Sequence, residues 1–184
     1  MKESPILFSG SMIRAIREGR KTQTRRVVKP QPAFEFHGVP FQKAHELGEQ
    51  PLPIRCPYGQ PGDRLWVRET WQHCQNCGGV DYAADVNKPR NCRHCDASLG
   101  NWKPSIHMFR DDSRITLEIV SVRVERLNDI SNEDCWNEGM CDETNPELKA
   151  NRKWFSELWE CINGPGSWDL NPWVWVVEFK EVKP

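Results

Sequence analysis

The chain has 184 residues, a formal net charge of −1, 38% hydrophobic residues and eight cysteines. Its length suits one domain with a single hydrophobic core and leaves little room for a second enzyme domain. No stretch approaches the roughly 18 consecutive apolar residues of a membrane helix, and the opening residues lack the apolar core of a signal peptide. We therefore expect a soluble, cytoplasmic protein without a membrane partner, whose cysteines stay reduced.

The first predicted elements are a short strand over residues 5–8 and the helix that follows it. Ser9 or Ser11 can cap the start of this helix, and Gly19 ends it. The backbone is therefore expected to change direction just before the most basic part of the chain.

This basic stretch, Gly19–Arg26, suggests an anion-binding site. Between Arg14 and Arg26 six lysines and arginines stand against one acid, Glu18, a local charge of six minus one, or +5. Arginine and lysine suit phosphates and carboxylates, and a concentrated basic patch is typical of nucleic-acid binding. The alternative is a solvated charged face. The candidate contact residues for a phosphate or nucleic acid are Arg20, Thr22, Arg25 and Arg26.

Lys21 and Thr24 lie within the same stretch. In a regular strand their side chains would point to opposite faces, because side chains alternate with period two. Joint action of the two residues therefore requires a turn or a bulge between them.

Residues 28–61 contain seven prolines and little periodicity, which predicts an irregular excursion over the site. A half-buried strand is predicted at 65–71. Within it, Trp66 and Trp71 are candidate stacking partners for bases, and Arg68 can face the same cavity as the basic stretch.

Three further elements complete the prediction. A long strand over 115–124 has a phase shift that indicates a bulge near Ser121. The segment 131–134 has the form of a capping box and begins a short helix that Gly139 ends, with Glu138 on its last turn. A helix beginning at Pro146 and a terminal strand over 173–179 follow. Strands predominate without a regular βαβ series, so we predict an α+β fold, a small mixed β-barrel with flanking helices.

Two CxxC motifs, separated by 14 residues, form the most specific chemical pattern in the chain. This spacing predicts a zinc site, and four thiolates would complete a tetrahedral shell, which makes the metal structural. Free thiols, disulfides, or ligation by His73 or His94 are the alternatives. The predicted ligands are Cys74, Cys77, Cys92 and Cys95, while ordinary buried or partly buried thiols are expected at Cys56, Cys135, Cys141 and Cys161.

The ASCH domain of the PUA-like superfamily resembles this chain in four ordered segments: GRKTQTRR, PGDRLWVRETW, PSIHMFRDDSRITLEIVSVRVERLNDISNEDCWNEGM and SWDLNPWVWVVEF. The similarity is to the phage and prophage form and covers nearly everything outside residues 28–55. It implies one PUA-like β-barrel domain over residues 1–184, with a zinc-ribbon-like insertion at 72–104. It also implies a cleft beside the Lys/Thr/Arg motif that binds RNA, DNA or a modified nucleoside.

Some small bacterial ASCH proteins hydrolyse the acyl amide of N4-acetylcytidine, and the resemblance carries their functional positions to Lys21, Thr24 and Glu138. Thr24 would attack the amide carbonyl, Lys21 would accept its proton, and Glu138 would pass a proton to the leaving amine. Arg25 or Arg26 would stabilise the oxyanion. Each residue also has a structural alternative: Thr24 in a turn, Lys21 as a surface phosphate contact, and Glu138 in solvent.

The segment 109–114 departs from the phage relatives, which carry a tryptophan where this chain has two acids, so an aromatic platform is not expected there. Three hypotheses follow from the sequence. The first is an ASCH module that recognises nucleic acid or a modified nucleotide. The second is an N4-acylcytidine amidohydrolase, and the third is a zinc-braced module that binds a protein partner.

Overall fold

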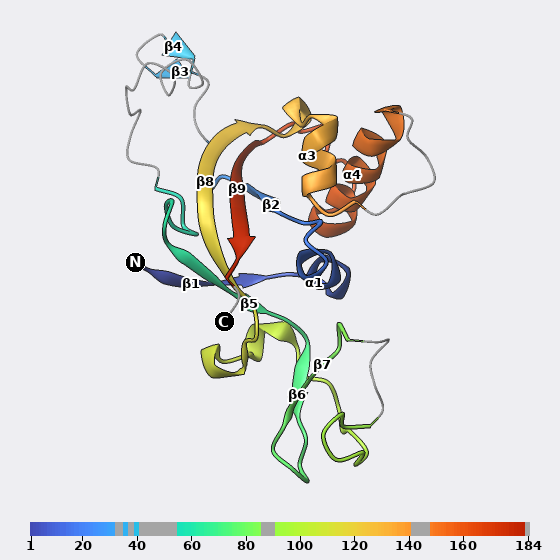
Figure 1. The fold of residues 1–184 in the computed structure, drawn as a ribbon. Helices are drawn as coiled ribbons and strands as arrows, with labels where there is room; N and C mark the ends of the chain where they lie inside the picture. Colours follow the sequence, from blue (N-terminus) through green and yellow to red (C-terminus); the bar gives the residue numbers. More distant parts are fainter. Residues whose placement is uncertain (32–34, 37–38, 41–54, 86–90, 141–147, 183–184) are drawn as a thin grey trace.

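The computed structural model describes residues 1–31, 35–36, 39–40, 55–85, 91–140 and 148–182. In this part of the chain the main element is a five-stranded sheet, with helices beside it and a small lobe below it (Figure 1). The strand order is β1-β5-β8-β9-β2, in which only β1 and β5 run parallel. The strands are β1 (Glu3–Leu7), β2 (Gln23–Val27), β5 (Arg64–Arg68), β8 (Thr116–Arg126) and β9 (Trp173–Glu181).

Within the described ranges, three α-helices and two small hairpins accompany this sheet. The helices are α1 (Gly10–Arg17), α3 (Asn132–Asn137) and α4 (Leu148–Asn163), with 3-10 turns at Ser105–His107, Arg110–Asp112 and Leu127–Asp129. The hairpins pair β3 (Glu35–Phe36) with β4 (Val39–Pro40), and β6 (Trp71–His73) with β7 (Val80–Tyr82). Among the helices of the described residues, none has the length and apolar character to cross a membrane.

The α+β class is confirmed, but the sheet of the described residues is open and does not close into the predicted barrel. β1 and β2 are the two edges of the sheet and do not pair with each other. One side chain crosses between them, because Nη2 of Arg26 donates to the carbonyl oxygen of Leu7 at 2.7 Å. A pocket occupies this open side, as described below.

Local signals position the helices as predicted. Ser9 is the N-cap of α1, and Gly19 follows the helix with φ of 75°. Ser131 and Asp134 form a reciprocal capping box at the start of α3, and Gly139 follows that helix with φ of 97°. Both glycines adopt left-handed backbone conformations that other residues rarely take, so both helix ends are encoded locally.

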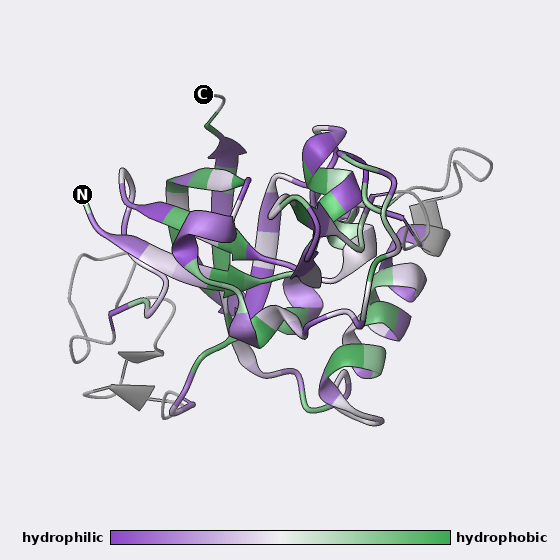
Figure 2. Cartoon of the chain, turned by 90° about the horizontal axis from the view of Figure 1, so that it is seen from below, coloured by the Kyte–Doolittle hydropathy of each residue, from purple (hydrophilic) through white to green (hydrophobic). Residues whose placement is uncertain are grey.

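Alternation along β9 divides the core into two clusters. Trp175 and Val177 face the cluster that includes α1, while Val174 and Val176 face α3 and α4, where Phe155 packs. Figure 2 shows this mixture of hydrophobic and hydrophilic positions along the strands and the helices. The sheet therefore has an apolar layer on each face, which is why the interior strand β9 carries a nearly continuous apolar run.

The other sequence predictions have mixed outcomes. The bulge in β8 is confirmed, because the register shifts between Ile119 and Ser121. The single strand predicted at 65–71 is wrong in its extent, since β5 ends at Arg68 and β6 begins at Trp71. Pro146 and most of the excursion at 28–61 lie outside the described residues, although the described part of the excursion contains the hairpin β3–β4.

Candidate active site and metal centre

A buried ion pair joins Lys21 to Glu138. Lys21 lies before β2 and forms an isolated bridge with Glu138, and the N–H of Thr22 donates to the carbonyl of Asn137 at 2.8 Å. The Nζ of Lys21 lies 2.7 Å from Oε2 of Glu138 and 2.9 Å from the Glu138 carbonyl oxygen. Lys21 is 2% exposed and Glu138 is 4% exposed. The predicted pair is therefore together, and inside the protein.

Arg25 contacts the same carboxylate from its other side. Nη1 of Arg25 lies 3.2 Å from Oε1 of Glu138, and its Nη2 lies 2.5 Å from Oε1 of Glu125 and 3.1 Å from Oδ2 of Asp134. The side-chain amide of Gln23 also donates to Asp134, at 2.8 Å. Two cations of the basic stretch are thus matched with three carboxylates of β8 and α3.

The basic stretch is therefore less positive at the surface than its sequence predicts, because Lys21 and Arg25 are paired with carboxylates. Burial lowers the pKa of Lys21, and the charge and hydrogen bond of Glu138 oppose that effect. Burial raises the pKa of Asp134, but hydrogen bonds from Gln23 and Ser131 and the charge of Arg25 outweigh it and bring that pKa down to about 2. Lys21 and Arg25 are therefore internal, neutralised cations and do not form part of an exposed anion-binding patch.

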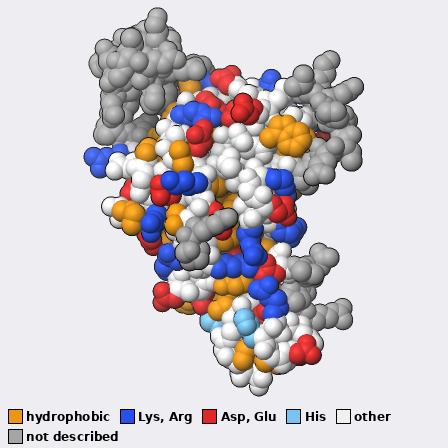
Figure 3. All heavy atoms as spheres, in the orientation of Figure 1, with side chains coloured by type: hydrophobic (Ala, Val, Ile, Leu, Met, Phe, Trp, Pro, Cys, Tyr) orange, Lys and Arg blue, Asp and Glu red, His pale blue; other side chains and the backbone are white. Residues whose placement is uncertain are grey.

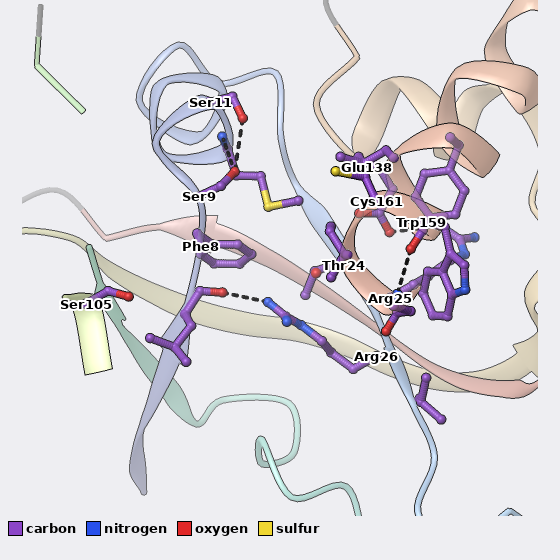
Figure 4. A pocket seen from close by; sticks show the side chains of 17 residues that line it. Phe8, Ser9, Ser11, Thr24, Arg25, Arg26, Ser105, Glu138, Trp159 and Cys161 are labelled. Atoms are coloured by element: carbon purple, nitrogen blue, oxygen red, sulfur yellow. Dashed lines mark hydrogen bonds and ion pairs between the residues drawn. The ribbon is translucent and has the colours of Figure 1, made fainter. Parts of the chain in front are cut away.

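A pocket of about 570 Å³ opens at the free edge of β2 (Figure 4). Its walls come from the junction of β1 and α1, from β2 and from α4, with Phe8 on one side and Leu158 and Ile162 on another. Thr24, Arg25 and Glu138 contribute the polar groups at its inner end. The pocket is thus mainly apolar, with a compact polar region beside the Lys21–Glu138 pair.

The side chain of Thr24 is 3% exposed and lines this pocket, yet its hydroxyl makes no hydrogen bond to another described residue. Lys21 approaches the same side of the sheet, since its Nζ lies 5.6 Å from the ring centroid of Phe8, another lining residue. Arg26 lies over the same ring at 5.5 Å. Thr22, between the Lys21 bridge and β2, belongs to neither of these elements.

The other candidates from the basic stretch lie elsewhere. Arg20 pairs with Glu18, and its Nη1 donates to the carbonyl oxygen of Gly139 at 3.0 Å, so it fastens the end of α3. Thr22 is exposed beside the bridge. Neither of these residues lines the pocket.

The aromatic candidates are also outside the pocket. Trp66 is 8% exposed and Trp71 is 1% exposed, and the guanidinium of Arg68 lies 4.6 Å from the Trp66 ring. Leu65 and Val67 of β5 join the core cluster, so Trp66 and Arg68 face the opposite side of the strand. The stacking surfaces of both tryptophans are covered by protein.

The pocket also contains residues that sequence reasoning did not assign to it. Glu125 and Asp134 do not line the pocket but pair with Arg25, and they were missed because nothing local in the sequence links them to Arg25. Cys161, for which a buried or partly buried thiol was expected, is exposed, and it lines the pocket together with Ile162 of the same helix, which is 55% exposed. The sequence alone does not show that, among the described residues, no strand pairs with this edge of β2.

The four cysteines of the CxxC motifs converge in the lobe that also carries the β6–β7 hairpin (Figure 1). Their sulfur atoms all lie within 4.8 Å of one another, with 3.6 Å between Cys74 and Cys95 and between Cys77 and Cys92. A tetrahedral zinc with Zn–S bonds of about 2.3 Å requires sulfur separations of about 3.8 Å, so the quartet fits a metal ion. His73 instead faces Asp112, at 3.1 Å.

No protein-family model matches the chain, and no curated protein matches it. Among solved structures, an ASCH domain from Lactobacillus crispatus aligns over 98% of this chain and 79% of its own, with 13% identity and a TM-score of 0.42. A protein of the DUF984 family from Enterococcus faecalis aligns over 99% of this chain and 81% of its own, with 10% identity and a TM-score of 0.46. Both the sequence identities and the TM-scores correspond to a distant similarity.

Proposed function

We propose that the pocket at the free edge of β2 binds one modified nucleobase, free or within a nucleic acid, as the ASCH-like motifs of the chain imply. The observation that carries this proposal is the pocket itself. Its volume of about 570 Å³ falls in the range of small-molecule sites, roughly 300–1,000 Å³. It combines apolar walls with the unbonded hydroxyl of Thr24 and the fixed carboxylate of Glu138.

The charges at the inner end favour an uncharged base over a phosphate. Lys21 and Arg25 already contact Glu138, and Arg25 also contacts Glu125. A phosphate placed beside Thr24 would be repelled by the Glu138 carboxylate, and Lys21 could not compensate because its charge is already paired with Glu138. An uncharged base carries no such penalty.

The edge of β2 offers backbone groups to the rim of a base. The carbonyl of Thr22 accepts from Phe179 and the N–H of Val28 donates to Trp173, so even-numbered residues pair with β9. Alternation along an antiparallel strand directs the N–H and C=O groups of Arg25 and Val27 toward the free edge. A base held between apolar walls can hydrogen-bond to such groups through its edge.

Alkylation of Cys161 tests where the ligand binds, because this thiol is exposed and lines the pocket. N4-acetylcytidine and other modified nucleosides are added to metal-loaded protein, and the rate of iodoacetamide labelling at Cys161 is followed by peptide mass spectrometry. We expect protection that saturates with ligand concentration, with the labelling of Cys56 as the internal control. Unchanged labelling across the panel would reject the pocket as the base site and favour the protein-interaction alternative.

We also propose a second function for the same pocket, hydrolysis of an N4-acylated cytidine. It is favoured by the unbonded Thr24 hydroxyl and by the burial that lowers the pKa of Lys21. In the tautomer of the ion pair in which the proton has moved from Lys21 to Glu138, the neutral Lys21 accepts the Thr24 proton while Glu138 donates to N4 of the leaving cytosine. The C–N bond breaks as an acyl ester forms on Thr24. Water then releases the acid by the reverse proton transfers.

Release of cytidine from N4-acetylcytidine tests this second function. Thr24→Val keeps the shape of the side chain and removes the nucleophile, so turnover should fall at least about 100-fold. Thr24→Ser is the matched variant and should retain measurable turnover. A Thr24→Val protein as active as the parent would exclude the mechanism, while binding without turnover in the parent protein would leave the recognition function alone.

We further propose that the cysteine quartet binds a structural zinc ion. Four thiolates complete the shell, so no position is left for a reactive water. The N–H of His94 and the side-chain amide of Asn76 donate to the sulfur atoms of Cys92 and Cys95, both at 3.4 Å, as expected around charged thiolates. In this proposal residues 72–104 form a metal-braced insertion within one domain over residues 1–184.

A further inference from the structure

We infer that a groove between α1 and the cysteine lobe binds phosphate groups of a polynucleotide whose base occupies the β2 pocket; this rests on the base-binding function proposed above. The groove has a volume of about 410 Å³. Arg14, Arg17 and Glu18, at the end of α1, line one side, and Arg93, from the second CxxC motif, lines the other together with Asp85. Helix α1 and the cysteine lobe thus both contribute guanidinium groups to the groove.

Each of these guanidinium groups is held by one hydrogen bond or ion pair and keeps further N–H donors that can contact a ligand. Nη1 of Arg17 lies 2.8 Å from Oδ1 of Asp85, and Nη2 of Arg93 lies 2.8 Å from Oδ2 of the same residue. Nη1 of Arg14 donates to the carbonyl oxygen of Ala84 at 3.3 Å. A guanidinium has five N–H donors, so most donors of Arg14 and Arg17 make no hydrogen bond within the described residues.

Two of the acids, Asp81 and Asp85, lie beneath the arginines, while the exposed Glu18 at the groove is paired with Arg20. The side chains of Asp81 and Asp85 are 0% and 9% exposed, whereas those of Arg17 and Arg93 are 49% and 47% exposed. The carboxylates therefore fix the arginines from below, and the positive groups face the solvent. Figure 3 shows lysine and arginine side chains gathered where the lobe meets the body. An approaching anion would therefore meet the guanidinium groups first, and each of them can donate two hydrogen bonds to a phosphate.

Within the basic stretch Arg26 lines the base pocket and donates to the carbonyl oxygen of Leu7, whereas the groove gathers arginines of the preceding helix. Lys21 and Arg25 are buried and paired with acids, and Arg20 is paired with Glu18. Arg14 and Arg17 are exposed on α1 and face the groove. The accessible charge thus lies beside the base pocket, where a phosphate backbone can reach it without entering the pocket.

The two sites share one helix. Ser11 and Met12 of α1 line the base pocket, while Arg14 and Arg17 line the groove. A helix with its side chains is about 10–12 Å across, and a stacked strand advances about 3.4 Å per nucleotide. A ligand that reaches both sites therefore spans about three or four nucleotides. This geometry predicts a single-stranded oligonucleotide in preference to a free nucleoside.

Fluorescence anisotropy with a labelled single-stranded RNA hexamer containing one N4-acetylcytidine tests the inference on metal-loaded protein. We compare the parent with Arg14→Gln/Arg17→Gln and with Arg93→Gln. Arg110→Gln is the matched control, because this arginine is 40% exposed and pairs with Glu3 as Arg17 pairs with Asp85. We expect the double variant to bind about tenfold more weakly at low salt, with a slope of log K against log salt that is smaller by about 1.4, the value for two lost phosphate contacts.

A parallel titration with free N4-acetylcytidine separates the two proposals. The groove variants should bind the nucleoside as the parent does, because the groove arginines do not line the base pocket. Hexamer affinity and salt slope equal to those of the parent in both groove variants would overturn the groove while the base site stands. If the parent protein does not bind the free nucleoside, both the base site and the groove proposal are overturned.

Discussion

Lys21 and Glu138, which are 117 residues apart in the sequence, meet at 2.7 Å with side chains 0% and 4% exposed. Arg25 contacts the other oxygen of the same carboxylate, so Glu138 is held between two cations. The cations Lys21 and Arg25 are therefore neutralised by Glu138 at the polar end of an otherwise apolar pocket.

Lys21→Met should lower the free energy of unfolding by about 3–5 kcal/mol. The reason is that Glu138 would keep a buried charge with only Arg25 as its cationic partner, and breaking one side of a buried pair carries a cost of this size. Urea unfolding at pH 7, analysed at constant slope, measures the change.

The double variant Lys21→Met/Glu138→Gln is the control for this prediction. Replacing both partners by neutral groups removes the unpaired charge, so the double variant should recover part of the loss. A loss below about 1 kcal/mol in Lys21→Met would mean that the pair is not buried as a charged unit.

Asp134 should make stability depend on pH in the acid range. Its folded pKa of about 2 lies below the value of about 3.9 in an unfolded chain, so its contribution is present above pH 4 and is lost as the pH falls from about 4 to 2. Asp134→Asn should reduce the free energy of unfolding by about 1–2 kcal/mol at pH 6, allowing for solvent screening, and by much less at pH 2.5.

Urea unfolding at the two pH values measures this difference. Asp111→Asn removes an exposed carboxylate and should change the free energy of unfolding by less than about 0.5 kcal/mol at either pH. An Asp134→Asn effect of the same size at pH 6 and pH 2.5 would contradict the linkage.

The sequence predicted the elements whose signals are local. The cap at Ser9, the helix end at Gly19, the capping box at Ser131 and the bulge near Ser121 each depend on neighbouring residues, and each is present. The same is true of the cysteine spacing, which predicted a cluster that forms. These features need no knowledge of the rest of the fold.

The properties of the site depend on distant residues and could not be predicted in the same way. Arg25 contacts Glu125 across 100 residues, and this contact decides that the guanidinium is internal. The open edge of β2 is likewise a property of the strand order of the described residues, and the pocket beside it is lined by Ile162, which is 55% exposed. A charge count along the sequence cannot report which cations meet acids after folding.

The cysteine quartet should bind one zinc ion per chain, measured by inductively coupled plasma mass spectrometry after dialysis. Cys77→Ser removes one of the four ligands and should lower the zinc content to less than half. Cys161→Ser, at an exposed cysteine outside the quartet, should leave it unchanged. Equal zinc in both variants would contradict the assignment of the ligands.

Removal of the metal should weaken RNA binding without affecting the nucleoside. The N–H of Arg93 donates to Asp81 at 3.2 Å, and Arg93 lies between two ligands of the quartet, so loss of the ion should release its side chain from the groove. Chelator-treated protein should bind the RNA hexamer several-fold more weakly and N4-acetylcytidine with unchanged affinity. Restoring zinc should reverse the change, and equal hexamer affinity with and without metal would argue against this coupling.

Isothermal titration of N4-acetylcytidine into the metal-loaded protein tests the central claim most directly. The account predicts saturable binding at one site, weakened at least about tenfold by Ile162→Arg, which places a bulky charge at the pocket wall. Val120→Arg, at a comparably exposed position outside the pocket, should bind as the parent does. Binding that is absent in the parent protein, or that is equal in the parent and Ile162→Arg, would contradict the claim that this pocket holds the base.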